Sequence, residues 1–481
     1  MLLKRFYHDG LAQASYLLGC QRTGEAIVID PNRDPEPYLA AADENDLTVT
    51  LVTETHIHAD YLSGSRELAR RCGAQLLLSA EGGPDWQYAF AAADGARLLR
   101  DGDQVMVGHV RLDVVHTPGH TPEHLTFVVT DVPSADHPLG AFTGDFLFVG
   151  DVGRPDLLER AANIQGTMRL GAVALFDSLE RFAGRYPDYL QVWPGHGSGS
   201  ACGKSLGAVP TSTLGYEKIA NWALRTHNRE AFIEEVLAGQ PDPPRYFATM
   251  KVLNRQGPAI LGKAPTAPRL GADRLTAALD AGARVVDIRR TAAFASGYIP
   301  GTINLPLGTS LVARAGWLLS YDADFFILTD AEDDARVKAA LAELAMIGLD
   351  RCAGWFGGDA LAARSTRALA LVPQLDAAAL SALLASDGVT LVDVRNDDEW
   401  AEGHIAGAVH IPLGRLEERL DEVDTSRPVV VQCRSGSRSS VAASLLQARG
   451  VAEVRNLAGG IVGWEKAGLP VVTEASTVAG D

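Results

Sequence analysis

Two histidines and an aspartate that follow one apolar run have the types and the spacing to hold a metal ion. They are His56, His58 and Asp60, in the stretch THIHADYLSG. Residues 47–53, just before them, are apolar or β-branched, which predicts a strand that ends near Thr53. A lone His-x-His pair is more often two surface histidines. Imidazoles and a carboxylate gathered at a strand end, however, go partly unsatisfied in a core and are complementary around a cation, so the pattern predicts a metal site.

Three further predicted strands run into a residue of the same chemistry beside glycine or proline. They are 110–116 before His120, 139–145 ending in Asp145, and 190–193 before His196. Taken singly, His120 or His196 is equally compatible with an ordinary turn histidine. Loops at strand ends can turn several side chains toward one point, so four such ends together describe one site.

These four stretches resemble the metallo-β-lactamase superfamily, and the match covers about the first half of the chain. The resemblance implies an αββα sandwich with its metal at one sheet edge. Within that superfamily, THIHADYLSG, TPGHTP, FTGDFLFVGDVGRPD and PGHGSG are most similar to the persulfide dioxygenases. That family holds one Fe(II) through residues that correspond here to His56, His120 and Asp145. Two histidines and one carboxylate leave open positions for O2 and a substrate.

The resemblance also suggests roles for the neighbours of this triad. Tyr61 stands where dinuclear hydrolases of the glyoxalase II type have a histidine, and its presence weakens a second metal site. His58, Asp60 and His196 are then expected to orient the ligands or to line the substrate pocket. Arg154 matches a family position near the substrate and is expected to hold an anionic part of a thiol carrier. A salt-bridged loop arginine is equally compatible with that position.

Five cysteines are scattered along the chain without C-x-x-C spacing, namely Cys20, Cys72, Cys202, Cys352 and Cys433. Their odd number fits a reducing cytoplasm rather than a disulfide scaffold. Cys202 lies six residues beyond His196 in a loop rich in glycine and serine. A thiol that borders the metal pocket can accept or pass on sulfur, and an unreactive loop residue is the alternative. The first, second and fourth cysteines are predicted to be structural.

An internal repeat occupies the second half of the chain. The stretch VDIR recurs as VDVR, and GYIPG recurs as GHIAG; Asp287 and Asp393 lie 106 positions apart, as do Gly297 and Gly403. Alternating strands and helices in each copy predict two small α/β domains with mostly parallel sheets. Both copies resemble rhodanese domains.

The second copy keeps the loop that carries chemistry in that family. A predicted strand over 428–432 delivers CRSGSRS into a helix, with Cys433 first and Arg438 near the end; the residues between them are Arg434, Ser435, Gly436 and Ser437. Backbone N–H groups in such a loop form an anion nest that favours a thiolate or persulfide, and Arg438 is expected to add a positive charge. A cysteine-based phosphatase is the alternative, but its loop characteristically has one more residue between the cysteine and the arginine.

The first copy has no cysteine at the equivalent place. Its strand over 325–329 leads to DAEDD, whose carboxylates repel an anion. This copy is therefore expected to be catalytically inactive, with a spacer or docking role.

Composition limits the partners of the chain. A formal charge of −17 argues against nucleic acid and against an anionic membrane surface. No apolar stretch is long enough to span a bilayer, and the N-terminus lacks the apolar segment of a signal peptide and is expected to be a first strand. The expected domains are a metallo-β-lactamase-like domain over 1–240, a linker over 241–268, an inactive rhodanese-like domain over 269–366 and an active rhodanese over 372–475.

The resemblance implies an enzyme with one Fe(II) per chain, and the cysteine content predicts that it is cytoplasmic. It would oxidise a low-molecular-weight thiol persulfide with O2 to sulfite, and Cys433 would carry sulfane sulfur between thiosulfate and a thiol acceptor. Sulfite made at the iron could also take up that sulfur and leave as thiosulfate. The main alternative is a dinuclear zinc thioester hydrolase of the glyoxalase II type with an accessory rhodanese. A binding protein with docking modules is a second alternative, and a homo-oligomer is compatible with the sequence.

Overall fold

The computed structural model describes residues 1–157, 159, 166–240, 243–332, 334–363 and 369–473. Its contacts divide the chain into two compact units, Met1–Ala264 with Ala345–Gly348, and Pro265–Leu344 with Leu349–Asp481. None of the helices in these described ranges is long and apolar enough to cross a bilayer. Parts of the predicted linker (241–242) and of the predicted domain ends (364–366 and 474–475), and Asp333 of the acidic stretch, lie outside the described residues.

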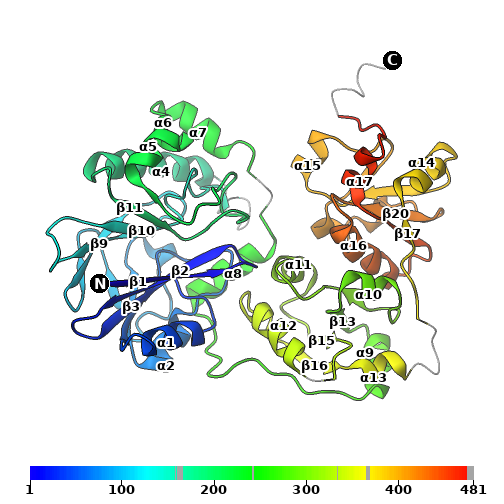
Figure 1. Cartoon of the computed structure of the whole chain (residues 1–481), viewed down its shortest axis with the longest axis horizontal. Coiled ribbons are helices and arrows are strands. Elements are labelled where there is room, and N and C mark those ends of the chain that lie inside the picture. Colours follow the sequence, from blue (N-terminus) through cyan, green and yellow to red (C-terminus); the bar gives the residue numbers. More distant parts are fainter. Residues whose placement is uncertain (158, 160–165, 241–242, 333, 364–368, 474–481) are drawn as a thin grey trace. The chain divides into compact units, whose positions relative to one another are not determined.

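The first unit contains two six-stranded sheets (Figure 1). The first sheet consists of β1 (Leu2–His8), β2 (Gln13–Cys20), β3 (Glu25–Ile29), β4 (Thr48–Thr53), β5 (Gln75–Ser79) and β6 (Arg97–Leu99). The second consists of β7 (Gln104–Val107), β8 (Val110–His116), β9 (Leu125–Asp131), β10 (Gly140–Gly144), β11 (Gln191–Pro194) and β12 (Ser212–Thr213). Both sheets are mixed: the first pairs β3, β4, β5 and β6 in parallel, and the second pairs only β10 with β11 in parallel.

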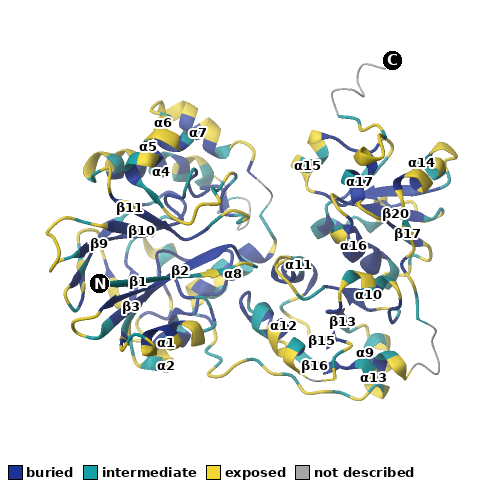
Figure 2. Cartoon of the chain, viewed as in Figure 1, coloured by how far each residue is buried: buried dark blue, intermediate teal, exposed yellow. Residues whose placement is uncertain are grey.

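The two sheets pack face to face with helices outside. Tyr16 and Ile27 of the first sheet and Leu112 and Phe127 of the second belong to one buried apolar cluster. The helices α1 (Glu36–Asp43) and α2 (Ser65–Cys72) cover the outer face of the first sheet. The outer face of the second is covered by α4 (Thr167–Arg185), α5 (Leu214–Ala220), α6 (Trp222–Arg225) and α7 (Arg229–Leu237). Figure 2 shows the central strands of both sheets mostly buried and the outward sides of these helices exposed. This is the αββα sandwich that the resemblance implies.

Strand direction brings the site residues to one edge of the second sheet. Both β8 and β10 run antiparallel to β9, so they run in the same direction, and β11 is parallel to β10. The carboxyl ends of β8, β10 and β11 therefore lie at the same edge of the sheet. His120, Asp145 and His196 all follow these ends.

The helix α8 (Tyr246–Gln256) lies inside the segment 241–268, which the sequence predicts to be a linker. Its side chains Phe247, Met250 and Asn254 are buried in the first unit, so this part of the segment is packed structure. The prolines at 243, 244 and 258 suggested a linker, but they stand on either side of the helix rather than inside it.

The second unit contains both copies of the repeat, each with its own parallel sheet. The first copy comprises α9 (Asp273–Asp280), β13 (Arg284–Asp287), α10 (Thr291–Ala295), β14 (Ile303–Asn304), α11 (Leu311–Leu318), β15 (Phe325–Leu328), α12 (Ala335–Ala345), β16 (Cys352–Phe356) and α13 (Gly358–Ala362). The second comprises β17 (Gln374–Leu375), α14 (Ala377–Ala385), β18 (Thr390–Asp393), α15 (Asp397–Glu402), β19 (Val409–His410), β20 (Val429–Gln432), α16 (Ser437–Ala448), β21 (Val454–Leu457) and α17 (Gly460–Lys466).

The repeated Asp-x-Arg has the same structural role in both copies. Arg289 Nη2 donates to Asp287 Oδ2 at 2.6 Å and to the carbonyl of Gly297 at 3.0 Å. Arg395 Nη2 makes the equivalent bonds to Asp393 and Gly403 at 2.7 and 2.8 Å. The pair thus ties a central strand to the repeated glycine loop, which explains why both stretches recur at one spacing.

The variant Arg289→Met is expected to destabilise the second unit. It leaves the Asp287 carboxylate buried without its cation, a change that typically costs about 3–5 kcal/mol. Urea denaturation followed by tryptophan fluorescence should therefore give a lower midpoint than in wild type. The control is Arg290→Met, because Arg290 is the exposed neighbour. Equal midpoints for the two variants would contradict this role.

Candidate metal centre and sulfur-transfer loop

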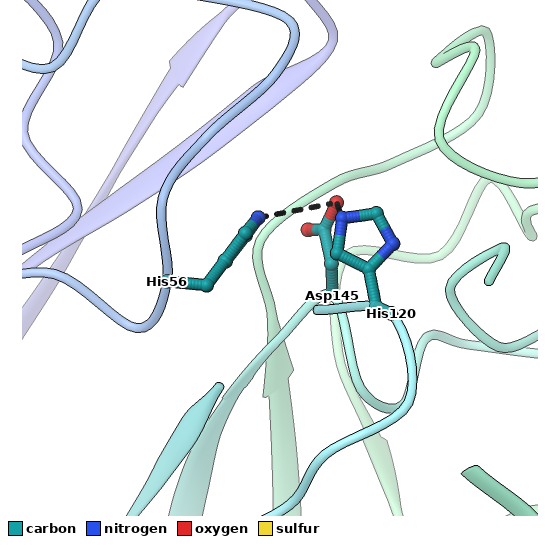
Figure 3. A group of neighbouring side chains, drawn as sticks. All are labelled: His56, His120 and Asp145. Atoms are coloured by element: carbon teal, nitrogen blue, oxygen red, sulfur yellow. Dashed lines mark ion pairs between the residues drawn. The ribbon is translucent and has the colours of Figure 1, made fainter. Parts of the chain in front are cut away.

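His56, His120 and Asp145 form one buried group (Figure 3). His56 follows β4, whereas His120 and Asp145 follow β8 and β10, so both sheets contribute to the group. Nε2 of His56 lies 3.9 Å from Oδ2 of Asp145, and Nε2 of His120 lies 3.6 Å from the same oxygen. Ligand atoms bonded to one ion at about 2.1 Å are separated by roughly 3–4 Å, so this arrangement can hold a metal ion.

Each of these two histidines is oriented by its other ring nitrogen. Nδ1 of His56 lies 2.9 Å from the hydroxyl of Thr55, and Nδ1 of His120 lies 2.9 Å from the carbonyl oxygen of Arg154. These bonds leave Nε2 of each ring directed toward Asp145. Burial lowers the pKa of both imidazoles, that of His120 to about 3, so both rings are neutral and can donate a lone pair.

The atoms of this group lack the partners that buried polar atoms normally have. Within the described part of the chain, Nε2 of His56 and both carboxylate oxygens of Asp145 are buried without a hydrogen bond. Such atoms are costly unless something compensates them. A cation bound between two neutral imidazoles and a carboxylate satisfies all of them, so the residues fit a metal ion.

Asp145 is positioned by its own neighbours in the chain and by a residue that the sequence analysis did not single out. Gly144 has φ of +48°, and a Cβ there would meet the Thr55 hydroxyl and Nε2 of His124. The backbone N–H of Asp145 donates to Nε2 of His124 at 3.1 Å. His124 lies four residues after His120 in the sequence, and the fold turns its ring toward Asp145.

His58 does not join the triad, and its ring binds Asp30. Nε2 of His58 lies 3.2 Å from Oδ1 of Asp30, and the Tyr61 ring lies beside it at 4.4 Å between centroids. Burial lowers the pKa of His58, but the carboxylates of Asp30, Glu54 and Asp60 together outweigh it and raise the pKa to about 9. Asp30 also accepts from the backbone N–H and the hydroxyl of Thr55. Asp30 was not expected at this site from the sequence, because it follows a different strand, β3.

A second group lies on the other side of Asp145. It consists of Asp60, His196 and Cys202, all buried. Nε2 of His196 lies 3.3 Å from Oδ2 of Asp60 and 3.4 Å from Oδ1 of Asp145. Asp145 thus presents one oxygen to each group. From the sequence, Cys202 was considered for sulfur transfer and not for metal binding. Its short distance from His196 in the sequence could have indicated that the two belong to one ligand group.

Arg154 is fully buried and paired. It donates two hydrogen bonds of 2.7 Å to the Asp156 carboxylate and one of 3.2 Å to the carbonyl of Ala201. This differs from the substrate contact expected for Arg154, because its charge is neutralised inside the protein. The salt-bridged loop arginine, the alternative considered for the sequence, describes its environment.

The helix α8 holds the loop that carries the first histidines. Asn254 donates to the carbonyls of His58 and Tyr61 at 2.8 and 2.7 Å, and its amide oxygen accepts from the N–H of Ser63. No local pattern indicated this role, since Asn254 lies nearly 200 positions from the loop.

The Cys433 loop joins β20 to α16 in the second copy. The Cys433 Sγ accepts from the N–H of Gly436 at 3.2 Å and from the hydroxyl of Ser439 at 3.4 Å. Gly436 has φ of +96°, and a Cβ on Gly460 would lie 2.2 Å from the carbonyl oxygen of Cys433. Both glycines are therefore needed for this compact turn, in which donors face the sulfur atom.

The arginines of this loop differ in their surroundings. Arg438 forms two hydrogen bonds to the Glu399 carboxylate, at 2.5 and 2.7 Å, so its charge is largely neutralised. Arg434 is exposed, as are Ser435 and Ser437. In the first copy, Thr329 follows β15 at the place where Cys433 follows β20, so a threonine stands at the position of the cysteine.

Comparisons with known proteins match each part of the chain separately. The model of the metallo-beta-lactamase superfamily matches residues 8–196, and that of the rhodanese-like domain matches residues 376–467. The crystal structure of a metallo-beta-lactamase from Staphylococcus aureus is 42% identical, covers 74% of this chain and 99% of its own, and superposes with a TM-score of 0.66.

Curated relatives of the first half include proteins with two different named activities. The human mitochondrial persulfide dioxygenase ETHE1 is 32% identical over 34% of this chain and 59% of its own length. The hydroxyacylglutathione hydrolase of Polaromonas sp. is also 32% identical, over 38% of this chain and 61% of its own. This chain thus spans about three fifths of these relatives.

The C-terminal part has a relative of its own. A sulfurtransferase of Allochromatium vinosum is 41% identical over 21% of this chain and 96% of its own length. The sandwich fold, the buried donor groups at its sheet edge and the Cys433 loop agree with these matches. The chain belongs to the metallo-β-lactamase superfamily and combines a domain of that family, which has persulfide dioxygenase relatives, with a C-terminal rhodanese-like domain.

Proposed function

We propose that the chain is a persulfide dioxygenase and sulfurtransferase. In the first reaction, R–S–SH, O2 and water give R–SH, sulfite and two protons, so the sulfane sulfur loses four electrons and O2 accepts them. In the second, Cys433 accepts sulfane sulfur and passes it to a thiol. The persulfide dioxygenase and sulfurtransferase relatives support both halves.

The main structural support for the persulfide dioxygenase reaction is that His58 lies apart from the triad of His56, His120 and Asp145. His58 is bound to Asp30, so His56, His120 and Asp145 remain as two imidazoles and one carboxylate. Fe(II) held there would supply open coordination positions and redox chemistry toward O2. The protein would contribute neutral imidazoles, fixed orientation through Thr55 and the Arg154 carbonyl, and a site closed to bulk water.

A cavity beside the triad is suited to an anionic thiol carrier. It has a volume of about 620 Å³, and its lining includes Ile57, next to His56, and Gly119, next to His120. Lys251 and Arg255 of α8 line the same cavity, with Asp85 as the one acidic residue among its described lining. Lys251 also stands over the Trp86 ring, with Nζ 4.4 Å from the centroid. A carboxylate-bearing persulfide such as glutathione persulfide would fit this chemistry.

The variant Lys251→Met is expected to weaken binding of such a carrier. We expect KM for glutathione persulfide to rise about tenfold, the equivalent of roughly 1.4 kcal/mol, with kcat little changed, because the charge acts on a remote part of the substrate. Burial lowers the pKa of Lys251 to about 7, with Glu123 acting in the opposite direction. Wild-type KM should therefore rise from pH 6 to pH 8 as the ammonium loses its proton, and the variant should lose this dependence.

A matched control for this charge is Lys263→Met, because Lys263 is exposed and lies outside the cavity lining. It should keep the wild-type KM and its pH dependence. Equal KM values for Lys251→Met and wild type would remove Lys251 from the binding site.

The proposed sulfur transfer is supported by the hydrogen-bond donors around the Cys433 sulfur. A thiolate there attacks the outer sulfur of thiosulfate; a Cys433 persulfide forms and sulfite leaves with the bonding electron pair. A thiol acceptor then takes the outer sulfur and restores the thiolate. The N–H of Gly436 and the hydroxyl of Ser439 stabilise the anionic sulfur in both forms. All five cysteines are free, which suits a reducing compartment such as the cytoplasm.

A dinuclear thioester hydrolase is the second candidate, and the group Asp60, His196 and Cys202 favours it. With Asp145 between the two groups, two zinc ions would be held side by side. The deciding experiment measures O2 uptake with glutathione persulfide, thioester cleavage and metal content on the same full-length protein. Rapid uptake with about one iron per chain supports the dioxygenase. Thioester cleavage with two zincs and no uptake would replace it.

A further inference from the structure

One arginine of the first rhodanese-like copy contacts the sulfur-transfer loop of the second. Arg314 lies on α11 and is partly buried. Its Nη2 donates to the hydroxyl of Ser437 at 2.8 Å, and Ser437 is the first residue of α16, directly after the Cys433 loop. Both residues belong to the same compact unit.

The contact belongs to a wider interface between the two copies. The N–H of Asn304 on β14 donates to the Ser444 hydroxyl on α16 at 3.0 Å, and Arg284 of β13 forms an ion pair with Glu417 at 2.9 Å. A cavity of about 570 Å³ is lined by Thr291 and Ser296, from the first copy, and by loop residues 435–437 of the second. The first copy, which has no cysteine at the position equivalent to Cys433, therefore forms part of the surroundings of the active loop.

Arg314 is also a partly buried cation beside this loop that no carboxylate of the described residues neutralises. Arg438 is held by Glu399 in a bidentate pair, whereas Arg314 has no carboxylate partner in the described part of the chain. Burial lowers the pKa of Arg314, while the negative charge of the Cys433 thiolate acts against this. The hydrogen bond to Ser437 places the guanidinium at the end of the Cys433 loop, and it stays protonated because arginine is so basic.

We propose that Arg314 is an anion-binding residue of the Cys433 site and that the inactive copy is retained to supply it. The ligands would be small sulfur oxyanions, with thiosulfate as donor and sulfite as product. The inference rests on the proposed sulfur transfer at Cys433 and extends it across the two copies. Arg314 binds the sulfonate oxygens while the sulfane sulfur moves to Cys433, so its charge assists both donor binding and departure of sulfite.

The test compares Arg314→Gln and Arg314→Lys in the full-length protein, with thiosulfate as donor and cyanide as acceptor. Arg314→Gln is expected to raise KM for thiosulfate about tenfold and to weaken inhibition by sulfite by a similar factor, whereas Arg314→Lys stays within about threefold of wild type. The control Arg274→Gln removes an exposed arginine of the same copy, on α9, and should match wild type.

Two outcomes would overturn the inference. An unchanged KM in Arg314→Gln would mean that the guanidinium does not bind the donor. An equal rise in the Gln and Lys variants would mean that Arg314 only joins the copies, because lysine keeps the charge but not the planar geometry of the contact to Ser437. A wild-type protein without any transfer from thiosulfate would instead refute the sulfur transfer itself, and the inference with it. Persulfide formation on Cys433, measured by mass spectrometry at saturating thiosulfate, verifies that each variant is folded.

Discussion

Replacing Asp145 by alanine is expected to lower the rate of O2 uptake with glutathione persulfide by more than about 100-fold. Even residues that only support a metal ligand typically contribute 10–100-fold to metal affinity or activity. Asp145 is the only carboxylate of the triad with His56 and His120, and one of its oxygens also faces His196. The variant should bind much less than one iron per chain. Oxygen-electrode rates and metal analysis of the same sample measure both effects.

Two further measurements on Asp145→Ala, its thermal stability and its sulfur transfer from thiosulfate, show whether the variant has lost only the metal site or its fold as well. Both carboxylate oxygens of Asp145 are buried without hydrogen bonds, so their removal costs the metal-free protein little. Thermal unfolding of the metal-free variant should match that of the metal-free wild type, and transfer of sulfur from thiosulfate should persist. Asp136→Ala, which removes an exposed aspartate, is the control for both activities. Full O2 uptake in Asp145→Ala would exclude this site.

Replacing Cys433 by serine is expected to abolish sulfur transfer from thiosulfate, by at least about 1000-fold, the scale on which loss of a covalent nucleophile acts. The serine hydroxyl fits beneath the same donors, Gly436 N–H and Ser439 Oγ, but it does not form a persulfide. O2 uptake with a supplied persulfide should remain within about twofold of wild type, because the triad belongs to the other unit.

The control for the serine variant is Cys352→Ser on β16 of the first copy, where the thiol donates to the carbonyl of Gly354. It should keep both activities. If Cys433→Ser instead lost O2 uptake as well as transfer, the two sites would act as one, and the proposal of two separable reactions would fail. If it kept transfer, another cysteine would carry the sulfur.

The sequence alone determined which residues end the strands of the first half. Alternating and β-branched runs predicted the strands before His56, His120, Asp145 and His196, and the structure has β4, β8, β10 and β11 there. Since sheet pairing fixes where strand ends lie, local periodicity was enough to expect that these side chains meet. The repeat could also be recognised from the sequence, because the ion pair of Asp287 and Arg289 needs the same neighbouring residues as the equivalent pair in the second copy.

Only the tertiary structure decided which of these groups face one another. Whether His58 turns to a metal or to Asp30, and whether Arg154 faces a substrate or Asp156, depends on side chains from other strands and loops. The same holds for Asn254, which supports the metal loop from a segment that the sequence predicts to be a linker. Arg314 contacts Ser437 at the end of the Cys433 loop from the other copy of the repeat. The physical reason is the same in each case. A buried polar side chain pairs with the group that tertiary packing places next to it, whereas spacing in the sequence gives periodicity within an element and not the distance between elements.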